Sequence, residues 1–121
     1  MGFDVWLEFR HKKISKEDFE RIKKKIPNIP EELKWEDGYL IMTDVTRSPD
    51  YDAVIDLLKE IAKTTGEPAF MLWQQDDYHD TIYVIATPDG KAFESEVVFE
   101  TDLGTVSSFD EYLRKWREVR K

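Results

Sequence analysis

The sequence contains no cysteine, and its longest uninterrupted run of apolar residues is only five. It therefore cannot form a disulfide framework, and it lacks the roughly 20 consecutive apolar residues that a membrane-spanning helix needs. The N-terminal residues include no basic stretch followed by an apolar one, which a signal peptide requires. We expect a soluble, cytoplasmic protein that does not bind membranes.

The sequence also lacks the usual signatures of catalysis. It has no glycine-rich phosphate loop, no plausible Ser-His-Asp set and, without cysteine, no thiol nucleophile. The densest polar cluster, residues 76–80, lacks the glycine and the distal glutamate of a calcium loop. We therefore expect a protein that is not an enzyme and that has no cofactor and no bound metal.

What the chain does contain is sufficient for one folded domain over residues 1–121. Of these residues, 40% are hydrophobic and 16 are aromatic, which is enough for a core at this length. Alternating apolar residues predict strands, and Ser15, Ser48 and Ser108 are the predicted N-caps of three helices, the second of which ends at Gly66. The strands are expected at residues 3–9, 39–45, 69–73, 81–87 and 91–99.

This order, β-α-β-α-β-β-β-α, predicts an α+β fold. We expect a single domain with a mixed five-stranded sheet, three helices packed on it and an antiparallel meander at its end. If the two helical connections are right-handed crossovers, the first three strands are parallel. A wholly antiparallel sheet with the helices on one side is the main alternative.

Charge is unevenly distributed along the chain. The formal net charge is −8, from 18 basic and 26 acidic residues. Residues 35–113 contain 4 basic and 18 acidic side chains, whereas the flanking segments, 1–34 and 114–121, are both net basic. The central acidic side chains have to lie at the surface, because an unpaired buried carboxylate is too costly to keep ionised. Such a surface repels nucleic acid and attracts basic proteins.

In the parallel arrangement, several of these carboxylates meet at one rim of the sheet, where the second and third strands end and the second helix begins. Tyr78 and His79 lie among them, and neighbouring carboxylates are expected to keep His79 protonated to higher pH than a free histidine. Trp35, in an acidic segment, is a further candidate interface anchor. The predicted partner-binding residues are Asp44, Asp50, Asp52, Asp76, Asp77, Tyr78, His79, Asp80 and Trp35, and Tyr51 lies between two of them in the sequence.

In size, acidity and expected fold the chain resembles bacterial immunity proteins, antitoxins and nucleic-acid-mimicking inhibitors. The resemblance implies a non-enzymatic inhibitor whose acidic surface blocks a basic protein partner, such as a toxin or nuclease. Two alternatives stay open. One is a small enzyme or ligand-binding domain with its site at the strand ends around His11, and the other is a subunit or homodimer that pairs through the edge strand at residues 91–99.

Overall fold

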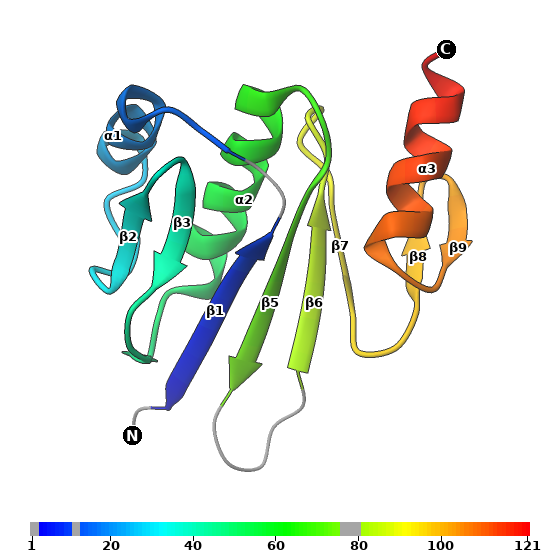
Figure 1. Cartoon of the computed structure of the whole chain (residues 1–121). Coiled ribbons are helices and arrows are strands. Elements are labelled where there is room, and N and C mark those ends of the chain that lie inside the picture. Colours follow the sequence, from blue (N-terminus) through cyan, green and yellow to red (C-terminus); the bar gives the residue numbers. More distant parts are fainter. Residues whose placement is uncertain (1–2, 11–12, 76–80) are drawn as a thin grey trace.

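The computed structural model describes residues 3–10, 13–75 and 81–121, and Figure 1 shows the arrangement of its elements. The strands are β1 (Asp4–Arg10), β2 (Leu33–Glu36), β3 (Tyr39–Met42), β4 (Thr46–Arg47), β5 (Ala69–Gln75), β6 (Thr81–Ala86), β7 (Ala92–Ser95), β8 (Phe99–Thr101) and β9 (Gly104–Val106). The helices are α1 (Lys16–Lys25), α2 (Tyr51–Thr65) and α3 (Phe109–Val119). The predicted α+β class, with three helices and a five-stranded sheet, is confirmed.

The five-stranded sheet has the order β4-β1-β5-β6-β7, and every neighbouring pair in it is antiparallel. The expectation that the first three predicted strands are parallel is therefore wrong, and of the alternative, the antiparallel sheet is confirmed but the placement of all helices on one side is not. β1 pairs directly with β5, with Val5 opposite Gln75 and Arg10 opposite Phe70. The start of β1 and the end of β5 consequently lie at the same end of the sheet.

The predicted strand at residues 39–45 is absent from this sheet because its first part forms a local hairpin. β3 pairs with β2 across a two-residue turn, Asp37-Gly38, in which both residues have positive φ. Asp-Gly is a strong signal for such a turn. Leu33, Leu40 and Met42 are buried, so the hairpin closes over one side of the main core.

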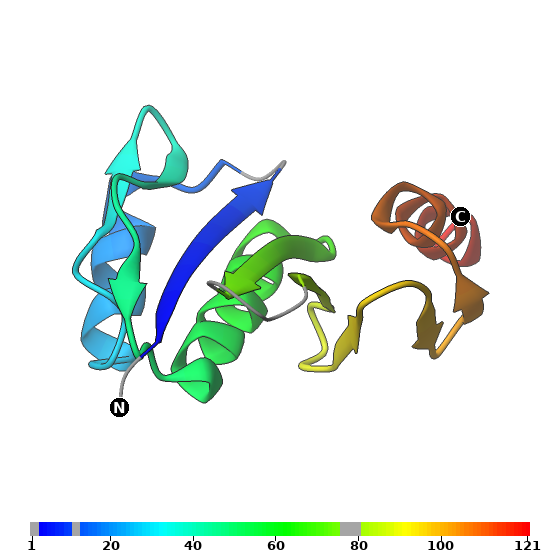
Figure 2. The same ribbon diagram turned by 90° about the horizontal axis from the view of Figure 1, so that it is seen from below.

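Alternate residues along β5 divide the interior into two cores on opposite faces of the sheet. Met71 and Trp73 belong to the larger core with α1 and α2, whereas Phe70 belongs to a smaller one with Ile85 and α3. Figure 2, seen from below, shows α2 and α3 on opposite sides of the strands. The helices therefore do not share one face, because a strand without a polar side needs cover on both faces.

Two of the three N-caps predicted from the sequence are confirmed. The side chains of Ser15 and Ser108 accept hydrogen bonds from the backbone N–H three residues later, as predicted. At α2 the prediction of Ser48 is wrong, because Asp50 is the N-cap and accepts from the N–H of Ala53. Gly66 ends α2 in the left-handed conformation, at φ 74°, as expected.

The predicted strand at 91–99 is interrupted between β7 and β8. The hydroxyl of Ser95 donates to the carbonyl of Val98 and accepts from the N–H of Val97 at 2.9 Å. This side-chain turn competes with a continuous strand. Val97, in this turn, is 79% exposed, whereas Phe99 is buried.

Candidate partner-binding surface

One end of the sheet brings together the start of β1, the end of β5 and the start of α2. Register places Val5 opposite Gln75 there, and Ser48 exchanges two hydrogen bonds with Phe3, one from each backbone N–H. The N-cap of α2 follows two residues later. We call the acidic residues of this region the acidic end and define it as Asp4, Asp44, Asp50 and Asp52.

The four carboxylates of the acidic end differ in what they contact. Asp4 lies 3.9 Å from the guanidinium of Arg47. Asp50 caps α2, and Asp44 accepts the N–H of Val45 at 2.8 Å. Within the described part of the chain, Asp44, Asp50 and Asp52 form no salt bridge, and all three are exposed. Three exposed carboxylates, two at the start of α2 and one in the connection between β3 and β4, are thus available to a cation from outside.

Asp50 and Asp52 also lie where the helix dipole favours anions, at the start of α2. Their placement in the first turn was predicted from the sequence, although with a different capping residue. Asp44 lies in the connection between β3 and β4. Asp76, Asp77, Tyr78, His79 and Asp80, the other predicted contact residues, lie outside the described residues.

Tyr51 connects the acidic end to β7, at the edge of the sheet. Its hydroxyl donates a hydrogen bond to the carboxylate of Glu94 on β7, and its ring packs edge-on against Trp73 at 4.8 Å. Burial, and then the hydrogen bond to Glu94, raise the pKa of Tyr51 well above its usual value near 10. Tyr51 therefore remains a neutral donor and holds the first turn of α2 in place.

Trp35 has a structural role that differs from the predicted interface anchor. Its ring is half-buried against the larger core, and its Nε1–H donates to the carbonyl of Ile14 at 2.8 Å. Both the apolar and the polar part of this side chain are thus engaged within the fold. The prediction that Trp35 binds a partner has no support in this position.

The alternative site around His11 depended on the end of the first strand lying at the rim. In the sheet, β1 ends at Arg10 opposite Phe70, whereas β5 ends at Gln75, five residues further on. The carboxyl ends of the two strands therefore lie at opposite ends of the sheet, and the premise of this alternative is wrong. His11 itself lies outside the described residues.

Several other acidic residues of the central segment form ion pairs with the two basic segments. Glu60, which is only 9% exposed, pairs with Lys25 between α2 and α1. Glu67 contacts the guanidinium of Arg117 at 3.0 Å, which links the end of α2 to α3. Sequence analysis missed these pairs because the partners are 35 and 50 residues apart.

A second network holds the C-terminal elements against the hairpin of β6 and β7. Lys91 lies 3.5 Å from Asp89 and 3.4 Å from Asp102, and Asp102 accepts a hydrogen bond from the hydroxyl of Tyr112 at 2.9 Å. Burial, and then this bond to Asp102, raise the pKa of Tyr112. The network commits Asp89 and Asp102 to internal contacts, so they do not belong to the acidic end.

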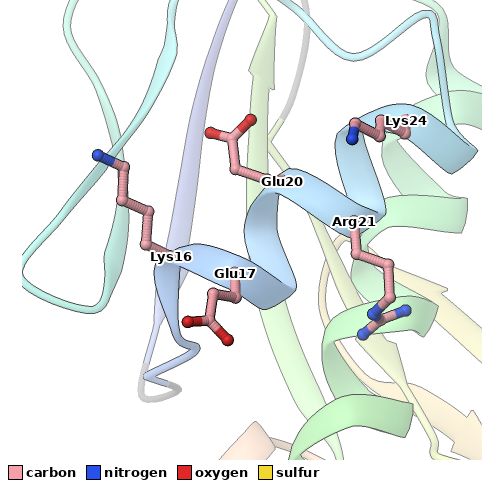
Figure 3. A pocket seen from close by; sticks show the side chains of 5 residues that line it. All are labelled: Lys16, Glu17, Glu20, Arg21 and Lys24. Atoms are coloured by element: carbon pink, nitrogen blue, oxygen red, sulfur yellow. The ribbon is translucent and has the colours of Figure 1, made fainter.

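An open depression of about 630 Å³ lies on the outer face of α1 (Figure 3). Its lining side chains are Lys16, Glu17, Glu20, Arg21 and Lys24, which point outward in different directions. Arg21 is already engaged with Asp18 and with the hydroxyl of Thr64. Because both signs of charge alternate along one exposed helix, this depression has no preference for a charged ligand.

A deeper groove of about 460 Å³ lies between the sheet and the start of α3. Its floor is aromatic, because Phe70 stacks on Tyr83 with ring centroids 5.9 Å apart and on Phe109 at 5.1 Å. Its rim is polar and includes the carboxylates of Glu96 and Asp110. Sequence analysis did not find this groove, because its residues come from β5, β6, the β7–β8 turn and α3.

Comparisons with known proteins give no match: no family model, no curated protein and no solved structure resembles this chain at a significant level. Among the described helices, none is long and apolar enough to cross a membrane. Within residues 3–10, 13–75 and 81–121, no three His, Asp or Glu side chains are grouped so as to hold a metal ion. The surface features above are therefore the basis for assigning a function.

Proposed function

We propose that this protein is a non-enzymatic inhibitor that binds a basic, nuclease-type protein through the acidic end. The observation that carries the proposal is that Asp44, Asp50 and Asp52 are exposed and have no cationic partner among the described residues. Glu60, Glu67, Asp89 and Asp102, by contrast, each lie beside a lysine or arginine. Three exposed carboxylates without such a partner thus occur within nine residues of the chain.

The mechanism follows from electrostatics. Carboxylates held on a helix N-terminus and on adjoining turns would occupy the positions that substrate phosphates take in a cationic cleft. Long-range attraction would accelerate the encounter, and it would weaken as salt screens the charges. The hydrogen bond from Tyr51 to Glu94 supports this role, because it restricts the movement of the first turn that carries Asp52.

The test begins with capture of a basic partner from the native host by the full chain, followed by affinity measurements with the purified partner. A triple variant, Asp44→Asn, Asp50→Asn and Asp52→Asn, removes three charges and keeps the capping ability of residue 50. We expect affinity to fall at least about ten-fold, and the affinity of the unmodified chain to fall steeply between low and high salt.

A matched control removes three exposed charges elsewhere, with Glu17→Gln, Glu20→Gln and Glu118→Gln. We expect this control to change affinity less than about two-fold, because distant exposed charges are screened. Equal effects of the two triple variants, or an affinity that does not depend on salt, would refute the proposal. Inhibition of nuclease activity by the unmodified chain, and its loss in the first triple variant, would establish the inhibitory role.

A further inference from the structure

The groove between the sheet and α3 has the composition of a site for a cationic side chain. Phe70, Phe99 and Phe109 form its buried floor, and Tyr83 is half-buried, so that part of its ring faces the opening. Val97, at 79% exposure, forms an apolar wall. A volume of about 460 Å³ lies within the range of roughly 300–1,000 Å³ that is typical of ligand pockets.

The rim of the groove is negatively charged. Glu96 and Asp110 are exposed, and within the described ranges neither forms a salt bridge or a side-chain hydrogen bond. Glu111, the next residue of α3, is engaged with Ser107 and Lys115. The partial positive charge of the α3 N-terminus is thus offset by Asp110 and Glu111, and Glu96 adds a further negative charge.

This combination selects the occupant by charge and shape. An anion is repelled by the rim, and an apolar side chain would remove water from two carboxylates without replacing its hydrogen bonds. A cation satisfies both carboxylates. Arginine fits better than lysine, because its planar guanidinium stacks on an aromatic face and its fork of donors matches a carboxylate.

The position of the groove relates it to the proposed interface. β7 runs toward the same end of the sheet as β5, because both are antiparallel to β6. Ser95, the last residue of β7, lies opposite Tyr83. Tyr83 is two residues from the start of β6 at Thr81, and Glu96 directly follows Ser95. The groove therefore lies toward the same end of the sheet as the acidic end, but on the face that α3 covers, opposite α2.

We infer that the groove receives an arginine side chain of the basic partner, with its stem against Val97 and its guanidinium between Tyr83, Glu96 and Asp110. This inference rests on the proposed function and makes it more specific. It gives the acidic surface a shaped pocket, which discriminates between basic proteins in a way that net charge does not.

The first experiment needs no natural partner. The full chain, labelled with 15N, is titrated with the peptide acetyl-Gly-Arg-Gly-amide and, separately, with the same peptide containing norleucine in place of arginine. We expect saturable shifts of the amides of Val97, Ser107 and Asp110 with the arginine peptide only. Absence of these shifts at millimolar peptide, or equal shifts with norleucine, would overturn the inference.

Variants then test the named contacts. Glu96→Gln combined with Asp110→Asn is expected to lower the affinity for the arginine peptide about five-fold. Tyr83→Leu should lower the affinity by a similar factor, although leucine keeps an apolar side chain at this position. Glu118→Gln, an exposed carboxylate at the other end of α3, is the matched control and should leave binding unchanged. Equal weakening by Glu118→Gln would show a non-specific charge effect and refute the site.

The same variants separate this inference from the proposed function. Suppose that neutralising Asp44, Asp50 and Asp52 weakens binding of the partner, whereas Tyr83→Leu combined with Glu96→Gln does not. In that case the groove is not an arginine site in the complex, and the acidic end is still the interface. If the groove variants weaken binding of the partner and the acidic-end variant does not, the arginine site is supported and the proposed interface is wrong.

Discussion

The hydroxyl of Tyr51, at the first position of α2, donates a hydrogen bond to the carboxylate of Glu94 on β7. The two residues are 43 positions apart in the sequence, and their contact joins α2 to β7. The Tyr51 ring also lies edge-on against Trp73 in the core, at 4.8 Å. A single side chain therefore connects the surface that we propose for partner binding to the packing of the sheet.

Replacing Tyr51 with phenylalanine should lower the free energy of unfolding by about 1 kcal/mol, because the hydrogen bond is lost and the ring contact with Trp73 is kept. Urea denaturation at neutral pH measures the effect. Tyr39→Phe is the control, since Tyr39 is exposed and should change stability by less than about 0.5 kcal/mol. Equal losses in the two variants would show that the Tyr51 hydroxyl does not stabilise the fold.

Stability should fall at alkaline pH because folding raises the pKa of Tyr112 above the unfolded value of about 10. The contribution of such a group is fully present below the unfolded pKa and is lost as pH rises through the folded pKa. Between pH 8.5 and pH 10.5 we expect Tyr112 to account for a loss of roughly 0.5 to 1 kcal/mol.

This pH dependence is measured by urea unfolding of the unmodified chain and of Tyr112→Phe at both pH values. The variant is less stable at pH 8.5, because Asp102 loses its donor, but its further decrease toward pH 10.5 should be smaller. Identical decreases in the two proteins would contradict the assignment.

Gly38→Ala should destabilise the hairpin of β2 and β3. Gly38 has φ +94°, where an alanine costs about 1–2 kcal/mol, and a Cβ there would lie 3.2 Å from Cγ of Lys13. Gly104→Ala is the control, because Gly104 has nearly the same φ, +95°, and a Cβ added there would lie in open space. Thermal unfolding should therefore show a larger loss for Gly38→Ala, and equal losses would mean that the Lys13 contact costs nothing.

Asp50→Ala should cost about 1 kcal/mol through loss of the α2 N-cap, whereas Asp50→Asn should cost only a few tenths, because asparagine caps nearly as well. Amide hydrogen exchange at Ala53 and Val54 reports the first turn directly. Protection there should fall in Asp50→Ala and persist in Asp50→Asn. Loss of protection in both variants would mean that the negative charge, rather than the cap, holds the turn.

The features that sequence analysis predicted correctly depend on residues close together in the chain. The three helices, the stop at Gly66 and the caps at Ser15 and Ser108 are all present. Helix caps and apolar faces arise from contacts within about four residues, and this is why they are readable locally. The Asp37-Gly38 hairpin was equally local, and its turn signal was overlooked.

The candidate site was predictable only in part. Asp52 lies in the first turn of α2 as expected, and Asp50 lies just before it as the N-cap, since both placements depend on the helix start alone. The grouping of carboxylates with strand ends depended on strand pairing, which the sequence does not specify. Glu96 and Asp110 were not selected, because nothing in their neighbourhood in the chain shows that they border the same groove.

The sequence by itself determined the class of fold, the helices and their apolar faces, and the excess of negative charge in the central segment. Only the tertiary structure decided that β1 lies antiparallel beside β5, that Lys25 neutralises Glu60, and that Tyr83 and Phe109 line one groove. The physical reason is the range of the interactions. Helix formation follows from short-range periodicity, whereas strand pairing, ion pairs between elements and grooves depend on which distant segments pack together.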